Sequence, residues 1–266
     1  MSTLVCFHAH PDDEALSTGG LMAKAAAAGH RVILVTATRG EQGEPTPGVL
    51  APDEPLWERR VVELAASAEI LGADPPRFLD YEDSGMMGEP TNDNPACFWQ
   101  ADVEEAAERL RTILTEVDAD VLTVYDDHGN YGHPDHIQVH RVGLQAAEMA
   151  GVSHVYEATV NRDAALESMA KMAAEMAEAG ADVPAIEDFE EFGVPENDLS
   201  HRIDVSGHLE VKRAAMQAHR SQIADDSFFL VMPPEAFGQT FGYEWFATPG
   251  QINTGGPVEV ELLPGL

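Results

Sequence analysis

The chain has 266 residues, of which 44% are hydrophobic, and its formal net charge is −32, from 47 acidic and 15 basic residues. This length and apolar content fit one large α/β domain and argue against wholesale disorder. A surface this negative repels phosphate backbones and anionic lipid, so nucleic acid and membranes are poor partners. The sequence contains no run of the roughly 20 apolar residues that a membrane span needs. The first residues also lack the pattern of a secretory signal, so we expect a cytoplasmic protein.

The acidic surplus has two interpretations that charge alone does not separate. In concentrated salt, dense carboxylates stay hydrated and screening removes their mutual repulsion. Alternatively, the chain is an acidic cytosolic protein from an Ala- and Asp-rich proteome. The two cysteines, Cys6 and Cys97, form no disulfide framework by their number and context, so we expect both to be reduced.

Short apolar runs alternate with helical patterns through the first 160 residues. The expected strands are Leu4–His8, Arg31–Ala37, Arg77–Leu79, Val121–Tyr125 and Val155–Val160, and the expected helices are Ala15–Ala28, Trp57–Leu71, Asp102–Val117 and His136–Met149. This alternation predicts an α/β fold with a Rossmann-like, mostly parallel sheet and helices on both faces. In such folds the active site lies at the C-terminal ends of the strands.

The rest of the chain shows no repeat and no domain boundary, so residues 1–266 are expected to form a single domain. Further expected elements are a helix from Arg162 to about Ala179, an acidic segment with little periodicity (Asp182–Asp198), a strand at Arg202–Val205, a helix at Gly207–Ser221 and an extended tail from about residue 248. Two long loops, Gly40–Pro55 and Glu82–Ala96, are expected to shape a substrate pocket.

Two clusters of histidine and aspartate carry the strongest chemical signal. The first, His8-Ala9-His10-Pro11-Asp12-Asp13-Glu14, follows the first strand directly. The second, Tyr131-Gly132-His133-Pro134-Asp135-His136, follows the strand Val121–Tyr125 at the same edge of the predicted sheet. Carboxylates packed this densely repel one another unless a cation lies among them. Zinc takes such nitrogen and oxygen donors, and catalytic sites use three protein ligands and keep one position for water.

These histidines and aspartates also have a simpler interpretation that needs no metal. A single His or Asp in a strand-to-helix loop is usually a helix cap or a solvated turn residue. Two such clusters at matching positions of the fold favour a shared metal instead. Other chemistries lack their motifs, because no G-x-G-x-x-G follows the first strand and no G-x-S-x-G is present.

With these two motifs the chain resembles the PIG-L/LmbE-like zinc-dependent N-deacetylases. That family includes the N-acetylglucosaminyl-phosphatidylinositol de-N-acetylases and the deacetylase and amidase of the mycothiol pathway. The resemblance extends through Asp83-Ser84-Gly85-Met86 and Lys212–Gln222. It implies one Zn²⁺ per chain, although iron, cobalt or nickel would suit the same donors.

The resemblance also implies a role for individual residues. It assigns the metal to His10, Asp13 and His136. Asp12 matches the general base, His133 the residue that steadies the oxyanion or protonates the leaving amine, Asp135 the residue that orients the His133 imidazole, and Tyr131 a tyrosine that swings toward the oxyanion. Arg60 (or its neighbour Arg59) and Asp83 match positions that hold sugar hydroxyls, and His219 one that packs close to the site.

Glu14 is grouped with the substrate-binding residues, with two alternatives. It could accept a hydrogen bond from the second nitrogen of a metal ligand, or it could cap the helix expected from Ala15.

The function implied by the resemblance is removal of an acetyl group from the amide nitrogen of an N-acetylglucosamine-type sugar conjugate. One alternative is an amidase that cleaves a larger amide, such as a mycothiol S-conjugate. Another is a non-catalytic sugar-binding protein on the same scaffold. The expected partner is a small N-acylated sugar conjugate, and a homo-oligomer is compatible with the sequence.

Overall fold

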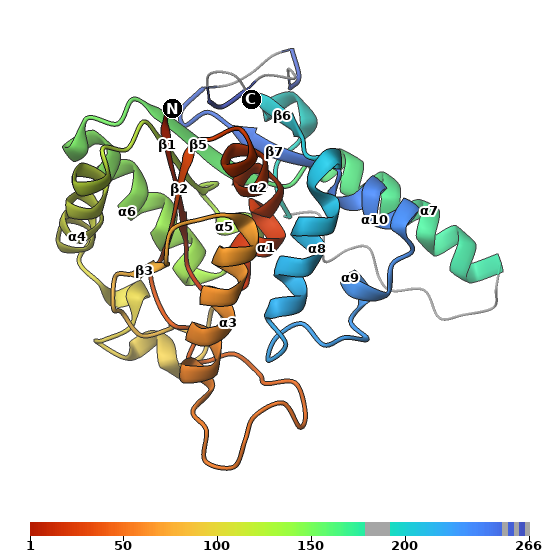
Figure 1. The fold of residues 1–266 in the computed structure, drawn as a ribbon, viewed down its shortest axis with the longest axis horizontal. Helices are drawn as coiled ribbons and strands as arrows, with labels where there is room; N and C mark the ends of the chain where they lie inside the picture. The colour runs from red at the N-terminus through yellow and green to blue at the C-terminus, as the bar shows by residue number, and fades with distance from the viewer. Residues whose placement is uncertain (179–191, 252–254, 258–260, 264–266) are drawn as a thin grey trace.

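The computed structural model describes residues 1–178, 192–251, 255–257 and 261–263, which form a seven-stranded sheet in the order β3-β2-β1-β4-β5-β7-β6 with helices packed against it (Figure 1). Strands β1 to β5 are parallel, and β6 and β7 extend one edge in antiparallel pairing. The bounds are Thr3–His8 (β1), Arg31–Thr36 (β2), Arg77–Phe78 (β3), Val121–Tyr125 (β4), His154–Thr159 (β5), His201–Asp204 (β6) and Tyr243–Ala247 (β7). The predicted α/β fold is thereby confirmed.

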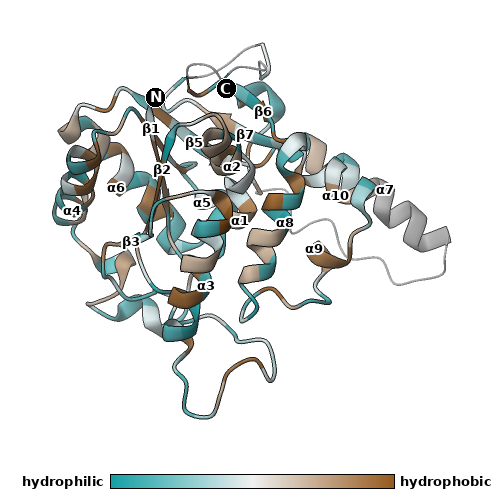
Figure 2. Cartoon of the chain, viewed as in Figure 1, coloured by the Kyte–Doolittle hydropathy of each residue, from teal (hydrophilic) through white to brown (hydrophobic). Residues whose placement is uncertain are grey.

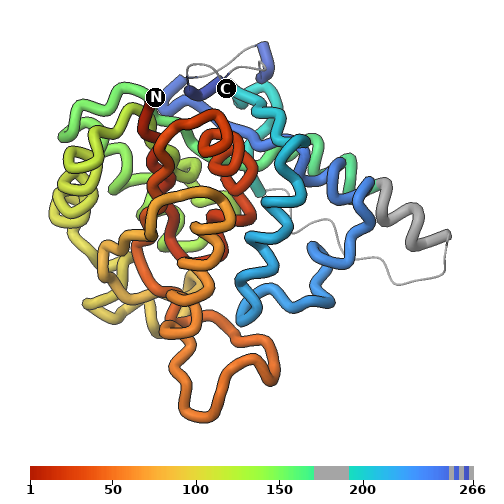
Figure 3. Tube along the Cα trace, viewed as in Figure 1, coloured from red at the N-terminus to blue at the C-terminus, as the bar shows by residue number. Residues whose placement is uncertain are grey.

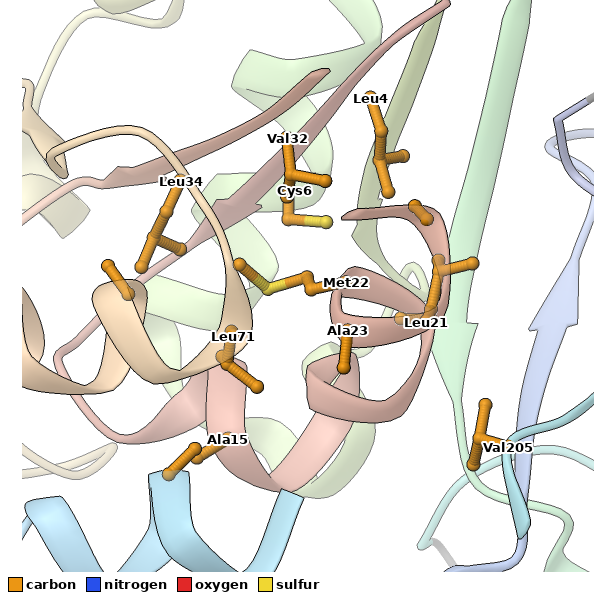
Figure 4. Packing of buried hydrophobic residues seen from close by; sticks show 14 of the residues in the cluster. Leu4, Cys6, Ala15, Leu21, Met22, Ala23, Val32, Leu34, Leu71 and Val205 are labelled. Atoms are coloured by element: carbon orange, nitrogen blue, oxygen red, sulfur yellow. The ribbon is translucent and has the colours of Figure 1, made fainter. Parts of the chain in front are cut away.

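The central strands are buried on both faces, which explains their unbroken apolar runs. In β1, Leu4 and Cys6 point into one core, whereas Val5 and Phe7 point into the other. Figure 4 shows the first core, where Met22 and Leu71 approach the Cys6 side of the sheet. Two layers of helices therefore cover the sheet.

The first core is covered by α1 (Asp13–Ser17), α2 (Gly19–Ala27), α3 (Leu56–Leu71) and α8 (Leu209–Ala218), and the second by α4 (Val103–Val117) and α6 (Pro134–Ala150). Helix α6 begins at a proline that follows the N-cap His133 and ends at Gly151 in the left-handed region (φ 75°). The remaining helices are α5 (Gly129–Gly132), α7 (Arg162–Glu178), α9 (Phe228–Val231) and α10 (Pro234–Phe241).

Two predictions about the elements were wrong or incomplete. The helix expected over Ala15–Ala28 is two helices, because Thr18 leaves helical geometry (φ −130°) and its hydroxyl contacts His8 Nε2 at 2.8 Å. The stretch before residue 248 also contains α9, α10 and β7, which the sequence did not indicate. Helix α9 is apolar along its whole length (Figure 2). In β7 the buried face carries Glu244, a carboxylate that obscures the alternating pattern of a strand.

The two long loops lie where they were expected. Residues 37–55 contain no helix or strand, and part of this stretch projects from the body of the molecule (Figure 3). Residues 82–96 include one turn of 3₁₀ helix at Pro90–Asp93. Much of Asp182–Asp198 and parts of the tail fall outside the described residues, so the single domain stays a prediction. Among the residues described, no helix is both long and apolar enough to cross a membrane.

The strand order places the two sequence clusters together. From β1 the chain moves outward through β2 and β3 on one side, while β4 and β5 lie on the other side of β1. Loops that leave adjacent strands in opposite directions open a crevice at the C-terminal strand ends, where ligands bind in open α/β sheets. The loops after β1 and β4 carry the two clusters.

Candidate active site

Asp13 joins the two clusters, because its carboxylate lies between two histidines from different strand ends. Its Oδ2 is 3.4 Å from Nδ1 of His10, and its Oδ1 is 3.5 Å from Nε2 of His136. All three side chains are nearly buried. The backbone N–H of His10 also donates to Asp13 Oδ2 at 2.8 Å, which fixes the carboxylate within the turn. The structure thus brings together the three residues predicted to bind the metal.

Each of the two distances, which start from different oxygens of Asp13, has the size found between ligands of one divalent metal. Donor atoms of His10, His133 and His136 also lie within 4.8 Å of one another. Four donors held at about 2.1 Å in a tetrahedron lie about 3.4 Å apart, and the two distances from Asp13 are 3.4 and 3.5 Å. The charge of the site fits as well. Burial alone would lower the pKa of His10, but the carboxylates of Asp83, Asp13 and Asp135 hold it well above its usual range. The site therefore stabilises positive charge, as a metal site with anionic ligands should.

Asp135 supports His10 with its carboxylate. Its Oδ2 lies 3.1 Å from Nε2 of His10 and accepts a hydrogen bond from the backbone N–H of Ser84 at 2.9 Å. The hydroxyl of Ser84 donates to the other oxygen. An imidazole that binds metal through one nitrogen commonly donates its other N–H to a carboxylate, which fixes the ring. The carboxylate of Asp135 thus faces His10 rather than His133.

Asp135 does orient His133, but through its backbone. The N–H of Asp135 donates to Nδ1 of His133 at 3.1 Å, in the geometry of a helix N-cap. Because Nδ1 accepts, the proton of the neutral ring lies on Nε2. Burial, together with the nearby His10 and His136, lowers the pKa of His133 to about 2. His133 is therefore a neutral hydrogen-bond donor at the edge of the site.

Asp12 directly precedes the candidate metal ligand Asp13 and has an unusual backbone conformation, with φ 103°. Its Oδ2 is 3.3 Å from the guanidinium of Arg60, whose NH1 donates to Gly40 O at 2.7 Å and whose NH2 donates to Pro11 O at 2.5 Å. Burial raises the pKa of the Asp12 carboxyl to about 6, although Arg60 opposes the shift. Such a carboxylate is poised to exchange a proton near neutral pH.

Arg60 and Arg59 were alternatives for a sugar contact, and they lie in different places. Arg60 is 3% exposed and is held by the turn that carries Asp12. Arg59 pairs instead with Glu54 in the long loop. Arg60 therefore belongs to the site and Arg59 to the loop that borders α3.

Glu14 was expected to contact the substrate, but it is 0% exposed. Its Oε2 accepts from the backbone N–H of Asp12 at 3.0 Å, and its Oε1 lies 2.6 Å from Nε2 of His219 and 2.5 Å from Oγ of Ser67. The first contact satisfies the N-cap residue of α1, in keeping with the capping alternative. With both oxygens bound inside the protein, Glu14 does not face a ligand.

Two further predicted residues border the site. Asp83 is 4% exposed, and its Oδ1 lies 3.5 Å from Nε2 of His10. Its carboxylate also accepts from the backbone N–H groups of Gln42 and Gly85. Tyr131 is 48% exposed, with its hydroxyl 3.5 Å from Nε2 of His136. This hydroxyl thus lies next to a candidate metal ligand, on a ring that is partly exposed to solvent.

Sequence reasoning gave no role to Tyr125 or Ser84. The ring of Tyr125 stacks on His136, with centroids 4.3 Å apart and planes 13° from parallel, and its hydroxyl is 2.8 Å from Nδ1 of His8. His8 is 1% exposed. Ser84 was part of a motif quoted for the resemblance, which could have identified it. Tyr125 ends a buried strand and looks like an ordinary core residue in the sequence.

Comparison with known proteins identifies the family of this chain. Residues 5–147 match the family described as PIG-L, GlcNAc-PI de-N-acetylase. A 1D-myo-inositol 2-acetamido-2-deoxy-α-D-glucopyranoside deacetylase of Thermomonospora curvata is 41% identical over 90% of this chain and 87% of its own length. A protein of the same name from Thermobifida fusca is 44% identical over 83% of each chain.

A solved structure shares the fold. The N,N'-diacetylchitobiose deacetylase from Pyrococcus horikoshii superposes with a TM-score of 0.54 and 23% identity over 85% of this chain and 72% of that one. The family match covers both clusters and more than half of the chain. The chain is therefore an enzyme of the PIG-L family, the GlcNAc-PI de-N-acetylases.

Proposed function

We propose that this chain is a zinc-dependent hydrolase that removes the acetyl group from the amide nitrogen of an N-acetylglucosamine-type sugar conjugate. The observation that carries the proposal is the position of Asp13, whose two oxygens lie 3.4 and 3.5 Å from nitrogens of His10 and His136. Relatives named as 1D-myo-inositol 2-acetamido-2-deoxy-α-D-glucopyranoside deacetylases support an acetylated sugar–inositol as the substrate.

In this proposal His10, Asp13 and His136 hold one zinc ion. Bound there, the metal supplies positive charge that polarises the acetyl carbonyl and acidifies water. Asp12 takes the proton from the attacking water, a task suited to a carboxyl whose pKa burial raises to about 6. The proton then passes to the amide nitrogen as the C–N bond breaks, which gives a free amine and acetate.

His133 and Tyr131 act on the oxygen of the acetyl group. Because Nδ1 of His133 accepts from the backbone of Asp135, its Nε2–H is available to donate to the developing oxyanion. The Tyr131 hydroxyl lies 3.5 Å from Nε2 of His136 at the exposed edge of the site. It adds a second hydrogen-bond donor beside the His133 N–H. Asp83, next to His10, is proposed to contact the sugar hydroxyls, and the buried Arg60, next to Asp12, to support the turn beside them.

A screen for amine release tests the proposal. Zinc-loaded protein is incubated with a sugar–inositol conjugate, with simple N-acetylated amino sugars and with a thioether-bearing amide, each with and without chelator. The proposal predicts fastest release from the acetylated sugar–inositol and none after chelation. Faster cleavage of the thioether amide would assign the amidase activity instead, and tight binding without release would indicate a binding protein.

A further inference from the structure

The starting point is the backbone of Asp12, the proposed base, which lies at φ 103° and ψ −30°. An L-residue avoids this region unless the surrounding structure enforces it, and such conformations gather at functional sites. The residues on either side, Pro11 and Asp13, are locked by their own contacts to Arg60 and His10. The backbone N–H of Asp12 also needs a hydrogen-bond acceptor.

Glu14 is that partner. Its Oε2 accepts the N–H of Asp12 at 3.0 Å, and Glu14 is 0% exposed. A buried carboxylate is stable only when its other lone pairs are satisfied. Here the second oxygen, Oε1, lies 2.6 Å from Nε2 of His219 and 2.5 Å from Oγ of Ser67. Glu14 therefore links the turn of Asp12 to two distant helices.

His219 is the more distant of these contacts. It lies 205 positions from Glu14 in the sequence, at the C-terminal end of α8, and is 0% exposed. Helix α8 packs beside α3 and α1 (Figure 1). Nε2 of His219 is occupied by Glu14, whereas its Nδ1 is buried without a partner. An apolar side chain would fill the space at this helix end equally well. The charge-assisted hydrogen bond of the buried imidazole therefore indicates a role beyond packing.

We propose that His219 is a positioning residue for the catalytic carboxylate of Asp12, acting through Glu14 on the backbone of the turn. The inference rests on the proposed function only in naming Asp12 as the base. Without the His219 hydrogen bond, Glu14 turns away from the Asp12 N–H and the backbone of the turn relaxes. The Asp12 carboxylate then moves out of the position in which it accepts a proton from water. A displacement of about 1 Å can cost about 100-fold in rate.

Two variants that differ by one methylene separate this role from simple packing. In His219→Gln the side-chain amide nitrogen stands near the position of Nε2 and can still donate to Glu14. In His219→Asn the amide is too short to reach it. The control is Ser221→Ala, two residues further on, because the Ser221 hydroxyl donates to Glu63 at 2.6 Å rather than to Glu14.

We expect His219→Asn to lower kcat by about 10- to 100-fold, with KM and bound zinc unchanged. His219→Gln should recover most of kcat, and Ser221→Ala should keep it. Equal kcat in His219→Asn and the wild type would overturn the inference. Loss of zinc in parallel with kcat would also overturn it, because the effect would then act through the metal ligand Asp13.

Crystal structures of the same variants give a readout that does not need activity. The φ angle of Asp12 should stay positive in His219→Gln and become negative in His219→Asn. An unchanged Asp12 turn in His219→Asn would refute the positioning role even if the wild type released no amine from any conjugate. Failure of the proposed function would appear separately, as an inactive zinc-loaded wild type.

Discussion

The carboxylate of Asp135 lies 3.1 Å from Nε2 of His10, on the opposite side of the imidazole from Asp13, whose Oδ2 is 3.4 Å from Nδ1. One ring nitrogen thus faces the other candidate metal ligands, and the other faces a supporting carboxylate. This arrangement fixes the ring and increases its basicity as a ligand. We therefore expect the Asp135 carboxylate to support metal binding by His10, a role that the sequence motif did not indicate.

Replacing Asp135 with asparagine should therefore weaken zinc binding. The neutral amide is a poorer acceptor for His10, and loss of such a supporting carboxylate typically costs about 10- to 100-fold in metal affinity. Competition with a chromogenic chelator measures the change. Asn92→Ala is a suitable control, because Asn92 donates to the carbonyl of Ser84 without touching the histidines. An Asp135→Asn variant with wild-type zinc affinity and reduced turnover would place its role on His133 instead.

The buried pair of Lys212 and Glu244 should be important for stability. Their charged groups are 2.6 Å apart, and Glu244 also accepts from the N–H groups of Gly20 and Leu21 at the start of α2. Lys212→Met leaves a buried carboxylate without its counter-charge, which typically costs about 3–5 kcal/mol. Denaturant unfolding measures the difference.

The exposed pair of Arg111 and Glu108 provides the comparison for Lys212. Arg111→Met should lower the free energy of unfolding far less than Lys212→Met, because solvent screens surface pairs. Similar losses from the two substitutions would mean that the buried pair contributes no more than a surface one.

Glu157 should make stability depend on pH. Burial, with Asp126 and Asp127 nearby, raises the pKa of its carboxyl from 4.5 to about 7, and His140 lies 3.3 Å away. The folded state therefore binds the Glu157 proton more tightly than the unfolded state does. The protonated carboxyl contributes to the free energy of unfolding below about pH 4.5, and this contribution is lost as pH rises to about 7.

Glu157→Gln removes this pH dependence. Relative to the wild type, the free energy of unfolding of the variant should therefore increase between pH 5 and pH 8, by at most about 3 kcal/mol. Urea unfolding at several pH values measures the gain. The exposed Glu104→Gln variant should show no such trend. A difference between Glu157→Gln and the wild type that is constant with pH would contradict the assignment.

Salt should stabilise this protein. With a formal net charge of −32, self-repulsion opposes the compact state, and molar salt shortens the screening length to about 3 Å. The melting temperature should rise from low to molar KCl, and an equimolar neutral osmolyte separates screening from general exclusion effects. A melting temperature that does not rise would exclude adaptation to high salt.

Much of the fold could be predicted because its strands are buried on both faces. The apolar runs from Leu4 to His8 and from Val121 to Tyr125 are visible without tertiary information. β7 could not be predicted in the same way, because its buried Glu244 is explained only by Lys212 and the start of α2, which are distant in sequence.

The candidate site, too, could be predicted only where it does not depend on partners distant in sequence. The His-Pro-Asp motifs indicated which residues meet, since loops after adjacent parallel strands share one edge. They did not indicate which way each side chain turns. Asp135 faces His10 because Ser84 holds it there, and Glu14 turns inward because His219 and Ser67 meet it. Such partners come from loops and helices that no local pattern connects.

In the proposed reaction Asp12 transfers the proton while His10, Asp13 and His136 hold the metal. The most direct test of this assignment is acetate and amine release by Asp12→Ala, measured on an acetylated sugar–inositol together with bound zinc. We expect one zinc per chain in the variant and a fall in kcat of about 100-fold or more. A variant that keeps both its zinc and its turnover would contradict the assignment of Asp12 as the base.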